Sequence, residues 1–93
     1  MKGNFIIMHP EDNCATSLAE IHEGEQIRIN GNNIIKINQI IPFGHKFALR
    51  DINKGELIKK YGQIIGIATQ VIRRGDWVHT HNVKSYYLEA VNK

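Results

Sequence analysis

The side chains best suited to chemistry include two histidines near the C-terminus, in the segment His79-Thr-His81. Alternate residues of a β-strand point to the same side, so both imidazoles could reach one metal ion from a strand. Two histidine ligands need a third, and usually a carboxylate or water as well. The candidates for the further ligands are His9, Asp12 and His45. Two exposed or hydrogen-bonded histidines would also fit this spacing, and the sequence leaves both interpretations open.

A second segment, Pro42-Phe-Gly-His-Lys46, joins a rigid bend and a flexible bend to a titratable ring and a cation. His45 and Lys46 together could contact a carboxylate or a hydroxyl group. Histidine suits proton transfer because its pKa lies near neutrality. Proline and glycine are typical of any tight connection, so an ordinary loop with an exposed Lys46 is the alternative.

A third segment, His9-Pro-Glu-Asp-Asn13, ends the first apolar run and could present His9, Asp12 and Asn13 together. Asp and Asn also suit a plain turn or a cap, which is the alternative here. Cys14 follows in an apolar stretch without an adjacent base, which predicts a buried, inert thiol. Phe47 and Trp77 are expected in the core.

The elements that must position these residues are repeated. Shifting the sequence by 31 positions sets 18–27 over 49–58, with coincident Leu, Ile, Gly, Glu and Ile. The match continues from Gly31 on Gly62 to Ile41 on Ile72. Two copies are too few for a solenoid, so we expect a pseudo-symmetric pair of halves that share one core. A third copy of the Ile-x-x-Gly-acid-x-apolar pattern begins at Ile72, and each copy predicts a turn with a positive φ at glycine before a strand.

Short isoleucine-rich runs between these turns favour strands. We expect strands at 25–29, 33–37, 37–41, 56–60, 63–70, 77–81 and 86–91. Helix signals are weak: Asp12 could cap 14–21, and 45–51 could coil one turn, so strand and short helix stay open in both places. The fold class expected is mainly β, with pseudo-duplicated short strands, Gly-Glu turns and at most one or two short helices.

Size and charge limit the function classes. The chain has 93 residues, 42% of them hydrophobic, with 12 Lys and Arg against 9 Asp and Glu. This predicts a single domain over 1–93 that is too small for a complete enzyme with an enclosed cleft and that works with a partner. The charges interleave, which argues against a nucleic-acid partner. Without a signal-like or membrane-length apolar segment, and with one cysteine, a cytoplasmic location is expected.

Several segments in order resemble the altronate/galactarate dehydratase family. They are His9-Pro-x-Asp-Asn13, Ile41-Pro-Phe-Gly-His-Lys-x-Ala-Leu-Arg-Asp-Ile52, Lys54-Gly-Glu56, Tyr61-Gly-x-x-Ile-Gly66, Ala68-Thr69 and His79-x-His-Asn82. The resemblance is to the small N-terminal SAF-type domain of those enzymes and covers nearly the whole chain. It implies the SAF-type β-clip fold.

In that family the small domain precedes a larger catalytic part, which is fused to it or is a separate chain, as in sulfolactate sulfo-lyases and split altronate dehydratases. The present chain stops where the small part would stop. The resemblance therefore implies the small subunit of a lyase that removes water or sulfite from a sugar acid or related hydroxy acid. It also implies a divalent metal, iron(II) or manganese(II), shared with the large subunit.

The resemblance suggests roles for the residues above. His45, Lys46 and His81 would be catalytic, Asp12, Asn13 and Asn82 would bind substrate, and His79 and His81 would bind the metal. The partners expected are the large catalytic subunit and the sugar-acid substrate, with self-association possible when the chain is isolated. The alternative function is a free-standing SAF module that binds a sugar acid, a metal or a protein without catalysis.

Overall fold

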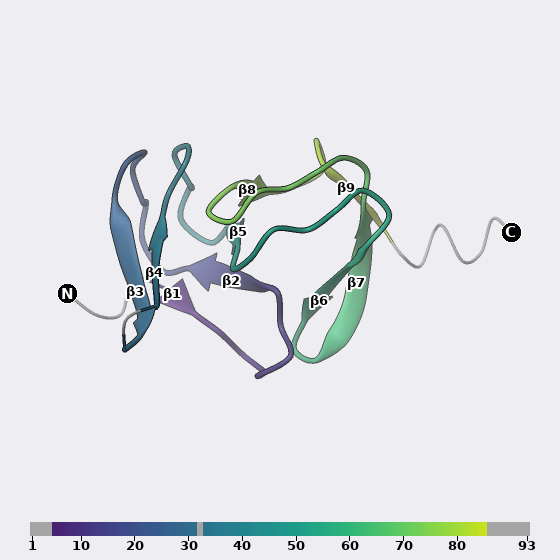
Figure 1. Ribbon diagram of the computed structural model, residues 1–93, viewed down its shortest axis with the longest axis horizontal. Coiled ribbons are helices and arrows are strands. Elements are labelled where there is room, and N and C mark those ends of the chain that lie inside the picture. Colours follow the sequence, from purple (N-terminus) through teal and green to yellow (C-terminus); the bar gives the residue numbers. More distant parts are fainter. Residues whose placement is uncertain (1–4, 32, 86–93) are drawn as a thin grey trace, which may run out of the picture.

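The computed structural model describes residues 5–31 and 33–85, and within these ranges the chain contains strands and turns but no helix (Figure 1). In chain order the strands are β1 (Phe5–Ile6), β2 (Cys14–Ser17), β3 (Gln26–Asn30), β4 (Asn33–Lys36), β5 (Lys46–Ala48), β6 (Leu57–Lys60), β7 (Gln63–Ala68), β8 (Trp77–Val78) and β9 (Val83–Ser85). The expected mainly β fold is confirmed. In the two places where the sequence left strand and short helix open, the structure has strands, β2 and β5. None of the described residues forms a helix long and apolar enough to cross a membrane.

A central antiparallel sheet, in the order β1-β2-β5-β8, joins the two halves of the chain. The hairpin of β3 and β4 lies on one side of it, and the three-stranded sheet β6-β7-β9 lies on the other (Figure 1). Successive side chains of a strand point to opposite faces, so each central strand places one residue toward one flank and the next residue toward the other.

This alternation builds two hydrophobic clusters instead of the single shared core that the repeat predicted. Ala15 and Phe47, paired across β2 and β5, belong to the cluster under β3 and β4, whereas Cys14 and Ala48, paired beside them, belong to the cluster under β6, β7 and β9. The first cluster comprises Ala15, Ile21, Ile27, Ile35, Ile37, Ile41 and Phe47. The second comprises Cys14, Ala48, Ile52, Ile58, Ala68, Ile72 and Val78. The shared element is thus the sheet between them.

The internal repeat is visible in the pairing of the chain. An isolated bridge joins Ile21 to Ile41, and its counterpart 31 residues later joins Ile52 to Ile72. The hairpins follow the same offset, because Gln26 pairs with Lys36 in the first and Leu57 with Ile67 in the second. Both hairpins contain an irregularity before the turn.

The predicted glycine turns are confirmed. Gly24, Gly55 and Gly75 have φ values of +89°, +91° and +90°. In each of these turns the acidic residue after glycine uses its carboxylate to accept a hydrogen bond from the backbone N–H three residues earlier. The acid of the repeated motif therefore closes its own turn, which explains its presence in every copy.

Two expected strands differ from the structure, and a third cannot be compared with it. The expected strand at 77–81 is wrong beyond β8, because 79–82 form a turn before β9. The expected strand at 37–41 is also wrong, since this stretch contributes only the bridge of Ile41. The expected strand at 86–91 lies outside the described residues.

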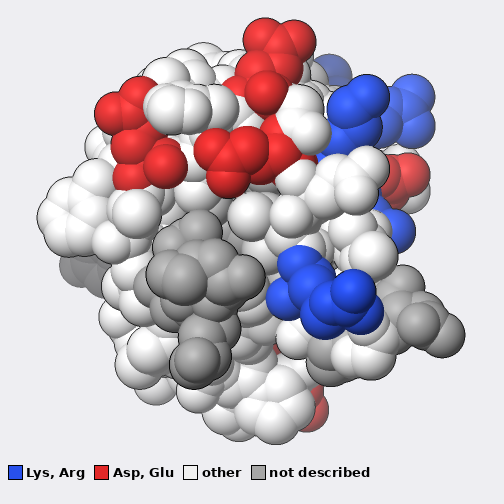
Figure 2. All heavy atoms as spheres, turned by 90° about the vertical axis from the view of Figure 1, so that its left-hand side faces the viewer, with Lys and Arg blue, Asp and Glu red and all other residues white. Residues whose placement is uncertain are grey.

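The face that carries β3 and β4 shows its charges in separate groups. Carboxylates gather along the upper part of this face, whereas basic side chains lie to the right and below (Figure 2). Binding to a nucleic-acid backbone would need a continuous stripe of positive charge. This face shows no such stripe (Figure 2). The absence of a nucleic-acid partner stays a prediction.

Candidate active site

The turn that carries His45 differs from the other glycine turns in its first residue. Pro42 has no backbone N–H, so this turn lacks the donor that the carboxylates of the other turns accept a hydrogen bond from. His45 stands where the second half of the chain has Asp76, 31 residues later. Gly44 keeps the positive φ, at +82°, and the His45 N–H closes the turn on the Pro42 carbonyl at 3.1 Å. The side chain at position 45 is thereby released from turn formation.

The released His45 ring meets Trp77 on β8. Its Nδ1 accepts a hydrogen bond from the Trp77 indole Nε1–H at 3.2 Å, and the ring centroids are 5.5 Å apart at 64°. A neutral imidazole that accepts at Nδ1 carries its proton on Nε2. The hydrogen bond therefore assigns His45 as a donor through Nε2, and its other nitrogen is already engaged.

Trp77 brings all three histidines of the predicted site together. The His79 ring stacks on the indole at 5.2 Å and 8°, and the His81 ring lies against it at 5.4 Å and 52°. The centroids of His45 and His79 are 4.9 Å apart. Sequence reasoning placed Trp77 only in the core, and it is in fact half-buried with one part packed on the first cluster. The position of Trp77, two residues before His79, is the sequence feature that could have indicated its contact with the histidines.

Asn82 shapes the turn that carries His79 and His81. Its side-chain oxygen accepts from the His79 backbone N–H at 3.0 Å, and its amide nitrogen donates to the Trp77 carbonyl at 2.8 Å. Local bonds of this kind favour turns over extended strands. The two histidines are therefore gathered by a turn around Trp77, and not by the strand alternation that the sequence suggested. Asn82 is 4% exposed, and its predicted contact with substrate stays a prediction.

Electrostatics favours the neutral form of His79. Burial is the main cause that lowers the pKa of this ring below its ordinary value, and the nearby His45, Lys46 and His81 lower it further. A neutral imidazole has a lone pair that can accept a proton or bind a metal ion.

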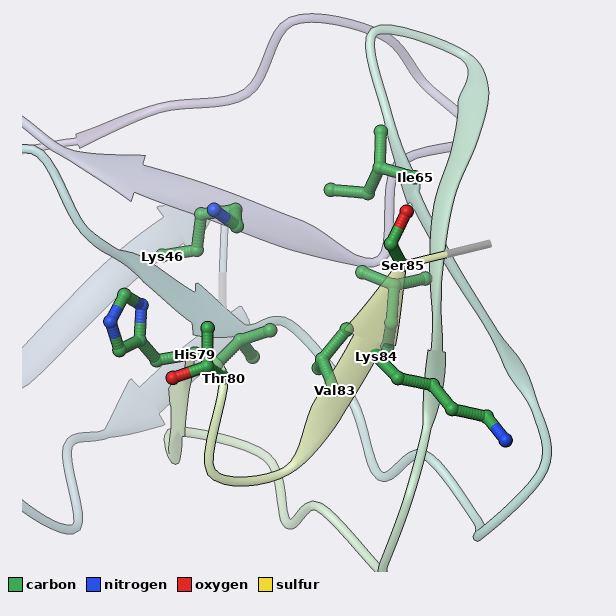
Figure 3. Close-up of a pocket in the computed structure, with 9 residues that line it drawn as sticks. Lys46, Ile65, His79, Thr80, Val83, Lys84 and Ser85 are labelled. Atoms are coloured by element: carbon green, nitrogen blue, oxygen red, sulfur yellow. The ribbon is translucent and has the colours of Figure 1, made fainter. Parts of the chain in front are cut away.

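Lys46 and His79 also line a cavity of about 260 Å³ between the central sheet and the β6-β7-β9 sheet (Figure 3). Lys46 lies on β5 with Thr16 and Val78 as its partners in register. The other lining residues are Ile58, Ile65, Val78, Thr80, Val83, Lys84 and Ser85. A cavity with aliphatic walls and an ammonium group on its rim can hold a small organic anion.

The residues of the Asp12 segment lie elsewhere. The Asp12 carboxylate accepts hydrogen bonds from the backbone N–H groups of Tyr61 and Gly62, and the His9 ring packs against Gly62. This loop and the β6–β7 turn lie together at the lower edge of Figure 1, whereas β8 lies near the upper edge. The structure therefore does not bring His9 or Asp12 to His79 and His81 as further metal ligands.

Asn13 ties the same loop to β6. Its side chain donates to the Leu57 carbonyl and accepts from the Lys59 N–H, both at 2.8 Å. Asp12 and Asn13 are buried and hold the second hairpin in place. Their predicted role in substrate binding stays a prediction, and the structure assigns them a role in folding.

Comparison with known proteins identifies the family of this chain. A family model described as "Altronate/galactarate dehydratase SAF domain" matches residues 3–86. The chain belongs to this family. The resemblance that the Gly-His-Lys and His-x-His-Asn segments suggested is thus confirmed.

Relatives of this SAF domain include both fused enzymes and small subunits. It is 41% identical to altronate dehydratase of Escherichia coli strain K12 over 81 residues, which are 87% of this chain and 16% of that enzyme. It is 46% identical to the (2R)-sulfolactate sulfo-lyase subunit alpha of Chromohalobacter salexigens over 50 residues, 54% of this chain and 53% of that subunit. A similar subunit alpha of Paracoccus pantotrophus is 42% identical over 45 residues, 48% of this chain and 67% of that subunit. The chain therefore spans a small fraction of the dehydratase and about half or more of the subunits.

The described residues of this SAF domain form no metal site on their own. Among residues 5–31 and 33–85, no three His, Cys, Asp or Glu side chains are grouped as a complete ligand set. Because His45 Nδ1 is engaged by Trp77, the donors of this cluster left for a metal are the rings of His79 and His81. Imidazole nitrogen suits first-row metals such as iron. A metal bound by these rings would need further ligands from outside the described residues.

Cys14 is the inert thiol that the sequence predicted. Burial raises the pKa of its thiol to about 11, and the thiol donates to the Lys59 carbonyl at 3.5 Å. The reactive species of a cysteine is the thiolate, which this environment suppresses.

Proposed function

We propose that this SAF domain is the small subunit of a heteromeric lyase that removes water or sulfite from a sugar acid or related hydroxy acid. A separate, larger subunit would complete the active site. The observation that carries the proposal is the convergence of His45, His79 and His81 around Trp77, beside the cavity that Lys46 lines. The similarity to sulfo-lyase alpha subunits supports it, because an alpha subunit implies a second kind of subunit.

The chemistry matches the side chains. Elimination beside a carboxylate needs a base for the α proton, and it needs charge stabilisation for the enolate that forms. Lys46 supplies a cation at the cavity, and His45 supplies a hydrogen-bond donor through Nε2. His81 is exposed in its turn and is the group we assign to protonate the leaving group. The base that removes the α proton would come from the larger subunit.

A divalent iron or manganese ion, when bound, would stabilise the developing enolate charge. His79 is the residue of this chain that would hold it, because the pKa of its ring is lowered and the residue lines the same cavity as Lys46. His81 is not given a ligand role in this mechanism, because a ring nitrogen that binds the metal has no proton to donate to the leaving group. The larger subunit would provide the remaining ligands.

The experiment that tests this function is reconstitution. The chain is expressed together with a larger dehydratase-like chain from the same genome, and elimination from altronate, galactarate and sulfolactate is assayed with added iron(II) or manganese(II). We expect turnover from the pair and none from either chain alone. Failure of the two chains to associate, together with direct binding of one of these acids to the SAF domain alone, would instead indicate the free-standing binding module.

A further inference from the structure

The β6–β7 turn holds a tyrosine in a conformation that tyrosine disfavours. Tyr61 has φ of +59° and is the only non-glycine residue with a positive φ in the described part of the chain. It is followed by Gly62 at φ +73°, and Lys60 pairs with Gln63 across this two-residue turn. Such turns need positive φ at both positions and favour Asn or Gly at the first. The corresponding turn of the first half begins with Gly31, at φ +47°.

The fold maintains this conformation with buried polar groups. One Asp12 carboxylate oxygen accepts from the Tyr61 N–H at 3.0 Å, and the other accepts from the Gly62 N–H at 2.8 Å. The side-chain amide of Asn13 donates to the Leu57 carbonyl and accepts from the Lys59 N–H, both on the adjacent strand β6. Strained residues of this kind persist where the surroundings over-determine them, and they cluster at functional sites.

Packing within the chain explains Gly62 but not Tyr61. A Cβ at Gly62 would lie 2.8–3.0 Å from atoms of the His9 ring, so glycine is required there. Tyr61 is 55% exposed and belongs to neither hydrophobic cluster. Its ring carries the Lys60 ammonium 4.7 Å from the centroid. Asparagine at this position would relieve the backbone without loss of core packing.

We propose that Tyr61, with Lys60 above its ring, is a docking point for the larger lyase subunit, and that it meets a carboxylate-bearing surface of that subunit. This inference rests on the proposed function. Tyrosine is enriched among the few residues that dominate binding energy at protein interfaces, because it offers a rigid apolar ring and a polar tip. The Lys60 cation adds attraction for a carboxylate. Tyr61 does not line the cavity beside Lys46 and His79, which separates this surface from the proposed chemistry.

The test substitutes Tyr61→Asn, because asparagine tolerates the positive φ. We expect the thermal midpoint of the isolated chain to rise by several degrees. We expect the affinity for the larger chain used in the reconstitution, measured by isothermal titration calorimetry, to fall at least about fivefold. Lys60→Gln should also lower the affinity and should weaken its dependence on salt. Ile34→Asn, at an exposed position of the first hairpin, is the matched control and should leave the affinity within about twofold of wild type.

Unchanged affinity of the Tyr61→Asn chain would overturn the docking role. So would retained affinity with a raised KM of the assembled pair, since that result would place Tyr61 at the substrate. A lower thermal midpoint would show that the tyrosine supports the fold and would remove the basis of the inference. If the wild-type chain itself does not bind the larger chain, the proposed function fails, and this docking role fails with it.

Discussion

At the scale of single residues, the site depends on which nitrogen of each imidazole is available. The indole of Trp77 donates to His45 and supports the rings of His79 and His81, so one side chain organises the other three. Trp77 does not itself carry a proton in the proposed reaction. It is a positioning residue for groups that do.

Trp77→Phe tests this role. Phenylalanine keeps an aromatic ring beside the histidines but removes the indole N–H, so the His45 ring loses the bond that selects its tautomer. We expect the ¹⁵N shifts of the two His45 ring nitrogens, measured by NMR, to move toward a mixture of tautomers. The loss in the free energy of unfolding should exceed the roughly 1 kcal/mol of one hydrogen bond, because the smaller ring also loses packing on the first cluster. Ring shifts of the exposed His22 serve as an internal control, and unchanged His45 shifts would contradict the assignment.

Cys14 predicts a pH dependence of stability. Its pKa is raised from 9.0 to about 11 in the folded chain, so the unfolded chain loses its proton first. The resulting stabilisation is complete below pH 9 and is lost as pH rises toward 11. Cys14→Ser can still donate to the Lys59 carbonyl but does not titrate there. Between pH 8.5 and about 10.5, urea unfolding of wild type should lose about 2 kcal/mol more than that of the variant. Parallel profiles would contradict the buried thiol.

At the scale of elements, the Asp12 carboxylate joins the β1–β2 loop to the β6–β7 turn. Asp12→Asn replaces one accepting oxygen with an N–H donor that faces a backbone N–H. We expect a loss of about 2 kcal/mol in the free energy of unfolding, measured with urea, because one of the two part-buried backbone N–H groups loses its acceptor. Asp51→Asn is a matched control, since Asp51 is exposed and accepts from the Arg74 N–H. Equal losses in the free energy of unfolding for the two substitutions would contradict the stabilising role of the Asp12 carboxylate.

The elements that the sequence predicted well are those with local signals. The 31-residue repeat, the glycine turns and the two hairpins follow from spacing and turn chemistry. The nature of β2 and β5 could not be predicted, because strands of four and three residues take their hydrogen bonds from partners far along the chain. The end of β8 was missed because it depends on the Asn82 amide.

The same limit applies to the site. The motifs identified His45, Lys46, His79 and His81, which the structure brings to one region. The indole bond of Trp77 depends on the register of β5 against β8, which the sequence does not reveal. For Asp12 and Asn13 the sequence left a binding site and a plain turn open, because the backbone groups that they bond lie 44 to 50 residues away.

At the scale of the whole molecule, we propose that the chain supplies only part of an active site. It belongs to the dehydratase SAF family and matches 16% of the length of a dehydratase relative. Two imidazoles would hold a metal only as part of a larger ligand set, and the described residues group no third ligand with them. Catalysis in this proposal therefore belongs to the assembled pair.

The most direct measurement is the turnover of that pair with His81→Ala in the small subunit. His22→Ala is the control, because His22 is exposed and bonds only to neighbouring residues of its own turn. We predict that kcat falls by about a hundredfold for His81→Ala, as expected when a proton-transfer group is removed, while the affinity between the subunits stays within about twofold. Turnover equal to that of the His22→Ala pair would contradict the account.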